Sequence, residues 1–410
     1  MELRDYQEKI KNEGLKIIRQ HRLLYLSMEV RTGKTLTSLS IAQELGVDNV
    51  LFITKKKAIS SINDDYDKLC PHNFSLFIIN YESMHKLSKI KWDMIILDEA
   101  HTLGAFPKPS KRSKQLKDLL KTNYSFVCLL SGTPTPESYS QMYHQVYGIP
   151  TNPFKQYTNF YKFCHDYVDV KQRKINGLYI NDYSRGKDTI LDAMKPYTIS
   201  YTQKAAGFES EIQEEVLYVP MKPITYQLVK RLKGDLIIEG KSGEVVLADT
   251  AVKLMMKLHQ LYSGSVKFES GNSMITDTSK AEFIKENFAG KKIGIFYKFK
   301  AELEVLKEVY GDKLTTDLKE FEITDKNIAL QIVSGREGIS LRWADYLVYY
   351  NIDFSATSYW QSRDRMTTKD RTFNKVYWVF ADKGMEKDIY KAVTKKKDYT
   401  LKHFKRDNED

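Results

Sequence analysis

The sequence predicts an α/β protein with two lobes, each built on a doubly wound parallel β-sheet. Short apolar runs with the length and the β-branched or aromatic content of buried parallel strands recur, and segments compatible with helices separate them. The runs also form two series with a looser stretch between them. We therefore expect lobes at residues 1–145 and 279–410, with a mainly helical insertion and linker at 146–278.

The apolar runs predict where the strands lie. In the first lobe they occupy residues 23–26, 50–53, 76–79, 94–97 and 126–130. In the second lobe they occupy residues 293–297, 329–333, 346–350 and 376–380. Between the lobes the sequence becomes rich in Tyr and Lys, and residues 249–262 place their apolar side chains on one broad face of a helix.

The composition favours a polyanionic partner and argues against a membrane or disulfide-bonded protein. The 410 residues carry a formal net charge of +11, and clustered Lys and Arg can displace counterions from a phosphate backbone. The chain has no apolar run of about 18 residues, and its polar N-terminus does not resemble a signal peptide. Three widely spaced cysteines predict neither disulfides nor a zinc site. We expect a soluble, cytoplasmic, monomeric protein without membrane contact.

A phosphate-binding loop is predicted directly after the first strand. Residues 28–35, with the sequence MEVRTGKT, lie between that strand and a helix-compatible run at 36–45. Backbone N–H groups at a helix N-terminus can hold phosphate oxygens, the Lys34 ammonium suits the β- and γ-phosphates, and the Thr35 hydroxyl suits Mg²⁺. Because Gly-Lys-Thr alone is common by chance, the prediction needs a second motif.

The second motif is a pair of carboxylates at the end of the fourth apolar run. Asp98 and Glu99 follow residues 94–97 directly, and two adjacent carboxylates are costly to bury unless a cation is present. Asp98 suits a Mg²⁺ partner, and Glu99 suits a group that orients and deprotonates an attacking water. An acid-rich helix N-terminus is the alternative explanation, and the spacing from the phosphate loop makes it the weaker one.

In order and spacing, these motifs resemble those of superfamily 2 helicases, and particularly the Swi/Snf-type translocases of double-stranded DNA. The resemblance rests on residues 33–35 (GKT), 98–101 (DEAH) and 131–134 (SGTP). Further family motifs are matched, in order, by residues 3–7, 80–82, 335–341 and 361–365. The resemblance covers nearly the whole chain apart from the middle insertion. It implies two RecA-like lobes that close on ATP and Mg²⁺ and step along DNA, with duplex DNA as the expected partner.

The resemblance also implies roles for individual residues. Those expected to hold the nucleotide and its Mg²⁺ are Arg4, Gln7, Arg31, Thr32, Gly33, Lys34, Thr35, Asp98 and Gly338. Those expected to act in catalysis are Lys34, Asp98, Glu99, Arg363 and Arg365. Those expected to relay the nucleotide state are His101, Ser131 and Thr133. Those expected to contact nucleic acid, mainly through phosphates, are Thr54, Lys55, Lys56, Asn80, Tyr81, Ser334, Gly335 and Arg336.

Two positions depart from the family pattern. Arg31 replaces a glycine of the phosphate loop. The motif at 361–365 is usually followed by a second arginine that neutralises charge on the transferred phosphoryl group, and Thr368 occupies that place. Arg365 matches the first arginine of the motif. The nearby basic alternatives for the second are Arg363, Lys369 and Arg371, and for Arg371 a surface ion pair is the preferred explanation.

Two other functions stay open. One is a strand-separating DNA or RNA helicase, which is the weaker choice because the sequence shows no recognisable separation pin or iron–sulfur cysteine set. The other is a nucleotide-regulated module that binds DNA and remodels complexes without sustained stepping. The threonine at position 368 keeps this second alternative open.

Overall fold

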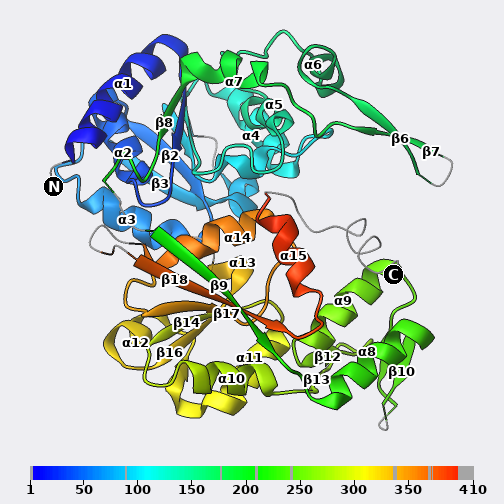
Figure 1. The fold of residues 1–410 in the computed structure, drawn as a ribbon. Helices are drawn as coiled ribbons and strands as arrows, with labels where there is room; N and C mark the ends of the chain where they lie inside the picture. Colours follow the sequence, from blue (N-terminus) through cyan, green and yellow to red (C-terminus); the bar gives the residue numbers. More distant parts are fainter. Residues whose placement is uncertain are drawn as a thin grey trace. The chain divides into compact units, whose positions relative to one another are not determined.

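The chain forms two compact units, Met1–Phe208 and Glu209–Asp410, in a computed structural model (Figure 1). The structure describes residues 3–87, 90–175, 178–207, 211–240, 243–335, 339–367, 371 and 373–395. Each unit contains one six-stranded sheet, and every strand pair within these two sheets is parallel. The predicted fold class of two doubly wound parallel sheets is therefore confirmed.

The sheet of the first unit has the strand order β3-β2-β4-β5-β1-β8. Its strands are β1 (Leu23–Met28), β2 (Asn49–Thr54), β3 (Ser75–Asn80), β4 (Met94–Leu97), β5 (Phe126–Leu130) and β8 (Thr198–Tyr201). Its helices are α1 (Asp5–His21), α2 (Lys34–Leu45), α3 (Ile59–Asp67), α4 (Lys111–Thr122), α5 (Met142–Val146), α6 (Phe160–Tyr167) and α7 (Thr189–Met194). Leu24 of β1 packs in a core with α1 to α3, and Tyr25 packs in the opposite core with α4 to α7, so helices cover both faces.

The sheet of the second unit has the strand order β15-β16-β14-β17-β18-β9. Its strands are β9 (Glu211–Val219), β14 (Ile293–Tyr297), β15 (Leu314–Thr315), β16 (Asn327–Gln331), β17 (Tyr346–Tyr349) and β18 (Phe373–Ala381). Its helices are α8 (Pro223–Asp235), α9 (Ala251–Tyr262), α10 (Ser279–Asn287), α11 (Lys300–Tyr310), α12 (Leu318–Ile323), α13 (Ile332–Gly335), α14 (Ala356–Ser362) and α15 (Glu386–Val393). Val348 of β17 packs with α10 and α11, whereas Leu347 packs in the core that contains the other helices.

Residues 146–278, expected as a mainly helical insertion and linker, contribute to both units and also contain strands. Strand β8 pairs with β1 in the first unit, and β9 pairs along the whole of β18 in the second. The segment also forms three hairpins, β6 (Lys171–Ile175) with β7 (Leu178–Asp182), β10 (Ile237–Glu239) with β11 (Val245–Leu247), and β12 (Ser265–Lys267) with β13 (Ser273–Ile275). Edge strands and hairpins need no continuous apolar run, which is why the apolar pattern did not reveal them.

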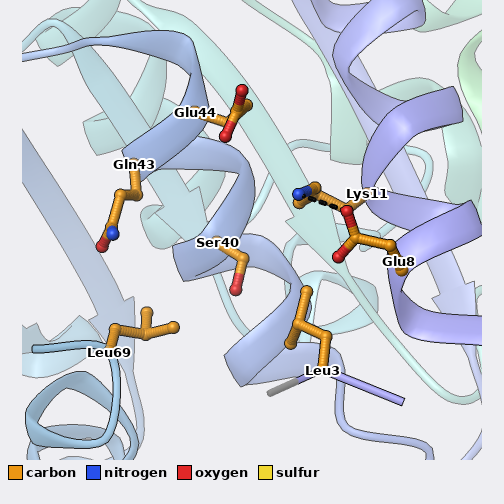
Figure 2. A pocket seen from close by; sticks show the side chains of 7 residues that line it. All are labelled: Leu3, Glu8, Lys11, Ser40, Gln43, Glu44 and Leu69. Carbon is orange, nitrogen blue, oxygen red and sulfur yellow. Dashed lines mark ion pairs between the residues drawn. The ribbon is translucent and has the colours of Figure 1, made fainter. Parts of the chain in front are cut away.

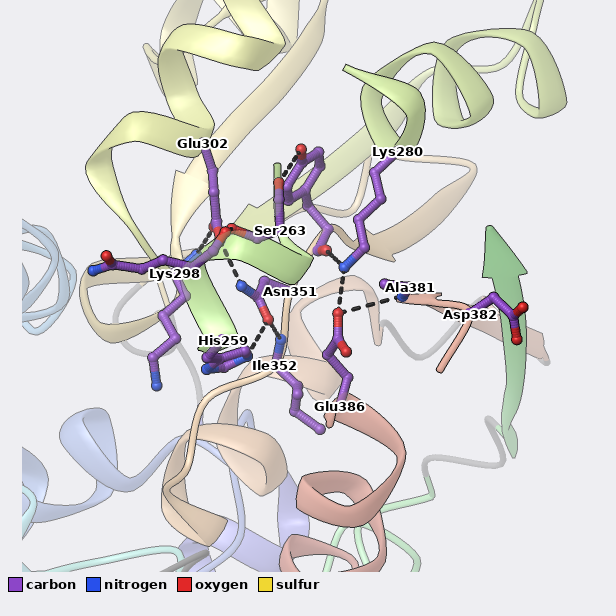
Figure 3. A network of polar contacts seen from close by, with 12 residues as sticks. His259, Ser263, Lys280, Lys298, Glu302, Asn351, Ile352, Ala381, Asp382 and Glu386 are labelled. Carbon is purple, nitrogen blue, oxygen red and sulfur yellow. Dashed lines mark hydrogen bonds and ion pairs between the residues drawn. The ribbon is translucent and has the colours of Figure 1, made fainter. Parts of the chain in front are cut away.

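A buried ion pair connects three elements of the second unit (Figure 3). Lys280 of α10 donates to Glu386 of α15 at 2.6 Å and to the Tyr350 carbonyl, just after β17, at 3.3 Å. Both charged side chains are completely buried. Glu386 also accepts a hydrogen bond from the backbone N–H of Ala381, at the end of β18. The pair therefore holds two helices against the carboxyl edge of the sheet.

A neutral hydrogen-bond chain lies beside this ion pair and connects α9 to α11 (Figure 3). Burial lowers the pKa of His259 well below its usual value, and the nearby Lys298 charge lowers it further. The neutral ring of His259 therefore donates from Nε2 to Asn351 Oδ1 at 2.5 Å, and Asn351 donates to Glu302 at 2.5 Å. The other carboxylate oxygen of Glu302 accepts the backbone N–H groups of Lys298 and Phe299, which caps α11.

We predict that Lys280→Met destabilises the second unit by about 3–5 kcal/mol, because it leaves the Glu386 carboxylate buried without its cation. Urea denaturation measures this loss. The double variant Lys280→Met/Glu386→Leu should recover most of it, since neither charge then remains in the core. Lys307→Met is the matched control, because Lys307 forms an exposed ion pair with Glu304 and should cost less than about 1 kcal/mol. A single variant at 280 that is as stable as this control would contradict the prediction.

Candidate functional site

The phosphate loop of the first unit connects the end of β1 to the start of α2. Gly33 is the N-cap of α2 and has a φ of +82°, so no cap side chain covers the first N–H groups of the helix. Lys34, the first helical residue, donates to the carbonyls of Met28 at 2.9 Å and Glu29 at 3.3 Å. Arg31 adopts a φ of +64°, which favours glycine and costs a non-glycine residue about 1–3 kcal/mol. The loop therefore has the shape of an anion site and keeps a strained arginine at its tip.

The N-terminal segment and helix α1 support this loop from one side. A Cβ atom at Gly33 would lie 2.0 Å from the Gln7 side-chain nitrogen, so the Gln7 amide occupies the space that only glycine leaves. Gln7 is buried, and its Oε1 accepts the backbone N–H of Arg4 at 3.0 Å. The Tyr6 hydroxyl donates to the Thr32 carbonyl at 3.1 Å. Arg4, Gln7, Thr32 and Gly33 are thus gathered around the loop.

A second support comes from residues that the sequence pattern did not indicate. The backbone N–H of Gln203 donates to the Glu29 carboxylate at 2.6 Å, and the Gln203 side chain donates to the Val30 carbonyl at 2.9 Å. The Tyr201 ring, at the end of β8, stacks on Tyr6 with centroids 4.9 Å apart. These residues lie about 170 positions after the loop, in the stretch with no strand pattern. Only the pairing of β8 with β1 brings them to the loop.

The carboxylate pair lies at the end of β4, two strands from β1 in the same parallel sheet. Asp98 accepts a hydrogen bond from the Thr54 hydroxyl at 2.8 Å, and its backbone carbonyl accepts from the Tyr81 hydroxyl at 2.6 Å. Glu99 has a φ of +49°, so the chain turns sharply at this residue. The carboxyl ends of parallel strands meet at one edge of the sheet, which brings the pair to the same edge as the phosphate loop.

The pKa values of Asp98 and Glu99 are shifted in opposite directions. Burial raises the pKa of Asp98, and the negative charge of Glu99 raises it further, while the Lys34 ammonium opposes both. Burial also pushes the pKa of Glu99 upward, but the hydrogen bond to His101 and the positive charge of Lys34 outweigh it and lower that pKa. Glu99 is therefore the ionised partner, and Asp98 lies in a position that a cation would stabilise.

A short chain of polar contacts leads away from Glu99. His101 Nδ1 lies 3.2 Å from Glu99 Oε2 and 3.1 Å from the Ser131 hydroxyl oxygen. The same hydroxyl oxygen accepts the backbone N–H of Thr133 at 3.1 Å. His101 and Ser131 are both buried. The structure therefore brings together the three residues expected to relay the nucleotide state, and connects them to the expected base.

The nucleic-acid candidates of the first unit fall into two groups. Thr54 and Tyr81 are buried and bonded to Asp98, so their hydroxyl groups support the carboxylate pair. Lys55 is half-buried, and its charge contributes to the low pKa of Glu99. Lys56 is exposed, and the half-buried Asn80 donates to Glu82 at 3.0 Å. Lys56 and Asn80 thus remain at the surface at this edge of the sheet.

The basic residues after α14 of the second unit have different surroundings. Arg363 donates to Glu214 of β9 at 2.6 Å, and its guanidinium lies 4.0 Å from the Trp360 ring centre. Arg365 is buried and donates from Nε to the Gln361 carbonyl at 3.0 Å. Arg371 donates to the carbonyls of Ala344 and Asp345, each at 2.7 Å. Arg371 therefore binds backbone carbonyls, where a surface ion pair was the preferred expectation.

Glu214 is the centre of an unpredicted, half-buried cluster. Besides Arg363, its carboxylate accepts from the Tyr359 hydroxyl at 2.7 Å, the Trp378 indole N–H at 2.8 Å and the Tyr390 hydroxyl at 3.2 Å. This set of donors gives Arg363 a structural partner and attaches α14 and α15 to the edge strand β9. Glu214 could not be singled out from the sequence, since it lies in an acidic segment, residues 209–215, with no apolar run.

Two further candidates of the second unit, Ser334 and Gly335, lie in α13, which follows β16 directly. The Ser334 hydroxyl donates to the Gln331 carbonyl at 3.2 Å. A Cβ atom at Gly335 would lie 2.7 Å from the Phe296 ring, so this glycine allows close packing. Arg336, Gly338, Thr368 and Lys369 lie outside the described residues.

One hollow of the first unit lies between α1 and α2 and has a volume of about 380 Å³ (Figure 2). Leu3 and Leu69 line it together with the ion pair of Lys11 and Glu8, whose atoms are 2.6 Å apart. Gln7 is not among its lining residues.

Over the described ranges, His, Cys, Asp and Glu form no cluster that would hold a metal ion by themselves. In the same ranges, no helix is long and apolar enough to span a bilayer.

Comparisons with known proteins identify the family. The family model described as "SNF2-related domain" matches residues 54–263, about half of the chain. The chain is 19% identical to the CHD3-type chromatin-remodeling factor CHR7 of Arabidopsis thaliana, over 79% of this chain and 28% of that protein. It is 22% identical to the helicase SWR1 of Mycosarcoma maydis, over 79% of this chain and 17% of that protein. The chain thus spans less than a third of the length of either relative.

Among solved structures, the chain is similar to the SWI2/SNF2 ATPase core of Sulfolobus solfataricus, determined in complex with double-stranded DNA. The two are 15% identical, with a TM-score of 0.44, over 96% of this chain and 91% of the other. The family match includes the carboxylate pair and the 131–134 motif, and the phosphate loop precedes it. On this match, and in agreement with the motifs read from its sequence, the chain belongs to the SNF2-related domain family of superfamily 2.

Proposed function

We propose that the chain hydrolyses ATP and uses the energy to translocate along DNA, with duplex DNA as the preferred track. One observation carries the proposal. A phosphate loop, an ionised Glu99 and a half-buried Asp98 occupy the same edge of one parallel sheet, and polar contacts connect Glu99 to Ser131 and Thr133. A merely structural acid pair would not need this connection.

Each group has a separate role in hydrolysis. The Lys34 ammonium and the N–H groups at the start of α2 bind the phosphates, a role that the absence of a capping side chain at Gly33 supports. Thr35 and Asp98 supply the hydroxyl and carboxylate oxygens that Mg²⁺ prefers, and Mg²⁺ when bound would neutralise charge on the phosphates. The raised pKa of Asp98 fits a place where a cation binds. Glu99, which is ionised, accepts a hydrogen bond from the attacking water and orients it.

The polar chain from Glu99 provides a route from hydrolysis to movement. A change at Glu99 alters the contact with His101, and His101 in turn shares its Nδ1 with Ser131. Ser131 holds the backbone N–H of Thr133. In this proposal, the loop at 131–134 changes its position with the nucleotide and passes that change to the DNA-binding residues.

The second unit would supply a guanidinium that neutralises charge on the transferred phosphoryl group. We favour Arg365 for this role, because it matches the first arginine of the motif at 361–365, whereas Arg363 forms an ion pair with Glu214. The two units would close on ATP and reopen after hydrolysis, a nucleotide-driven domain closure. Contacts from Lys55, Lys56, Asn80 and Ser334 to DNA would be mainly to phosphates, and so independent of base sequence.

We predict that Lys34→Ala and Glu99→Gln each reduce ATP turnover by at least about 100-fold, because they remove a phosphate ligand and the group that orients water. Turnover should be measured without nucleic acid and with duplex DNA, single-stranded DNA, forks and RNA. For the parent chain we expect the strongest stimulation with duplex DNA. The exposed residues Lys16 and Glu13 of α1 give matched controls, Lys16→Ala and Glu13→Gln. Equal turnover of the parent with and without every nucleic acid would rule out the motor.

A second prediction concerns the relay. Ser131→Ala should reduce the stimulation of turnover by DNA about tenfold while the rate without DNA stays within about twofold, because it removes the bridge between His101 and Thr133 but no phosphate ligand. Ser113→Ala is the control, since Ser113 is also buried and donates to the His144 carbonyl, away from the relay. Loss of both rates in the same proportion would assign Ser131 to catalysis instead of coupling.

A third prediction separates the two arginines. Arg365→Ala should reduce turnover by about 100-fold or more with little change in the affinity for ATP, as expected for a charge used in the transition state. Arg363→Ala should lower the stability of the second unit by about 1.5–3 kcal/mol, because the half-buried Glu214 carboxylate loses its charged partner but keeps its neutral donors. Nucleotide binding, single-turnover hydrolysis and urea denaturation measure these effects. A stable Arg363→Ala protein with abolished turnover would move the catalytic role to Arg363.

A further inference from the structure

The β6–β7 hairpin of the first unit extends away from the rest of that unit as a two-stranded ribbon (Figure 1). Its strands pair with each other in the register Lys171 with Asp182 through Ile175 with Leu178, and they form a sheet of their own. Each strand has five residues, which corresponds to about 17 Å of extended chain. A ribbon of this kind is marginally stable in water unless its base or its surface has a partner.

The base of the ribbon is firmly attached. Val168 and Gly186 form an isolated bridge, and backbone bonds run from Asp169 to Arg185 and from Lys187 to Tyr167, each at 2.9 Å. The Ser140 hydroxyl donates to the Tyr183 carbonyl at 2.7 Å. A Cβ atom at Gly186 would lie 2.6 Å from the Ser140 nitrogen, so the base also packs closely. The hairpin is therefore an arm held at one end.

The exposed side chains of the arm are aromatic, apolar and basic, a combination that suits binding to a partner. Tyr179 is 68% exposed and Ile180 is 49% exposed, and because adjacent positions of a strand face opposite sides, each face of the ribbon has a large exposed side chain. Lys171 and Gln172 on the opposite strand are exposed as well. In sequence, residues 168–187 contain five Lys or Arg and two Asp, so the arm has an excess of positive charge.

We propose that the β6–β7 ribbon is a DNA-binding arm that lies in the major groove of duplex DNA. The major groove, about 12 Å wide, admits a two-stranded ribbon. The basic residues would contact the phosphates on either side, while Tyr179 and Ile180 would pack against base edges and sugars. An acidic protein surface would suit the charge but would not need a narrow, protruding ribbon. The inference rests on the proposed function, since it assigns a further contact to the same DNA.

The experiment compares the parent chain with a variant in which residues 171–182 are replaced by a short Gly-Ser linker, so that the anchored base is kept. ATP turnover is measured against the concentration of duplex DNA at several salt concentrations. We expect the variant to need at least about tenfold more DNA for half-maximal stimulation, with an unchanged rate without DNA and an unchanged maximal rate.

A charge-reversal variant, Lys171→Glu/Arg173→Glu, keeps the test valid should the deletion variant fail to fold. It should reduce the slope of log affinity against log salt by about 2, whereas Tyr179→Ser/Ile180→Ser should weaken affinity with little change of slope. The matched control Lys9→Glu/Lys16→Glu reverses two exposed charges on α1 and should have the smaller effect. Duplex DNA with glucosylated hydroxymethylcytosine, which fills the major groove, should bind the parent as weakly as plain duplex binds the deletion variant.

Three results would overturn the proposal. The first is a deletion variant with the DNA requirement of the parent. The second is a parent that binds groove-blocked and plain duplex equally well. The third is a deletion variant that loses the unwinding of forks but keeps its affinity for duplex, which would make the ribbon a separation pin. A parent with no stimulation by any DNA would instead contradict the proposed motor itself, and the two failures are therefore distinguishable.

Discussion

The function inferred for this chain depends on one electrostatic constraint, the placement of two carboxylates and one ammonium at the carboxyl edge of a single parallel sheet. Asp98 and Glu99 are costly to bury together, and the charge of Lys34 offsets part of that cost. Two further contacts complete the compensation, the hydrogen bond from Thr54 to Asp98 and the approach of His101 Nδ1 to within 3.2 Å of Glu99. Nearly every other feature of the site holds one of these three charges in place.

Contacts from other parts of the first unit hold the phosphate loop in its conformation, and with it Lys34. Its strained Arg31 and its Gly33 would not keep their backbone conformations in isolation. The Gln7 amide fills the space beside Gly33, and Gln203 binds the loop from the other side through Glu29 and Val30. Residues near both ends of the unit's sequence thus fix the loop at 28–35, and the pairing of β8 with β1 brings Gln203 to it.

Features that depend on a local sequence pattern could be predicted, whereas features that depend on the pairing of strands distant in the sequence could not. The central strands, α9 and the carboxylate pair follow from apolar runs and short motifs, and they were placed correctly. The predicted strand at 329–333 is shifted, because β16 ends at Gln331 and α13 begins at Ile332. Strand β9, Glu214 and Gln203 were missed, since a charged edge strand and a distant polar contact become visible only when the sheet is assembled. The burial of Thr54 and Tyr81 could not be predicted from the sequence either, because it results from packing in the folded unit.

The most direct test of the central claim is a structure of the chain with Mg²⁺ and a non-hydrolysable ATP analogue bound to the first unit. We expect the Lys34 ammonium at the β- and γ-phosphates, Thr35 and Asp98 next to the metal, and Glu99 within hydrogen-bonding reach of a water facing the γ-phosphate. A nucleotide bound elsewhere, or one bound at the loop while Asp98 and Glu99 face away from it, would show that these residues do not form the ATPase site.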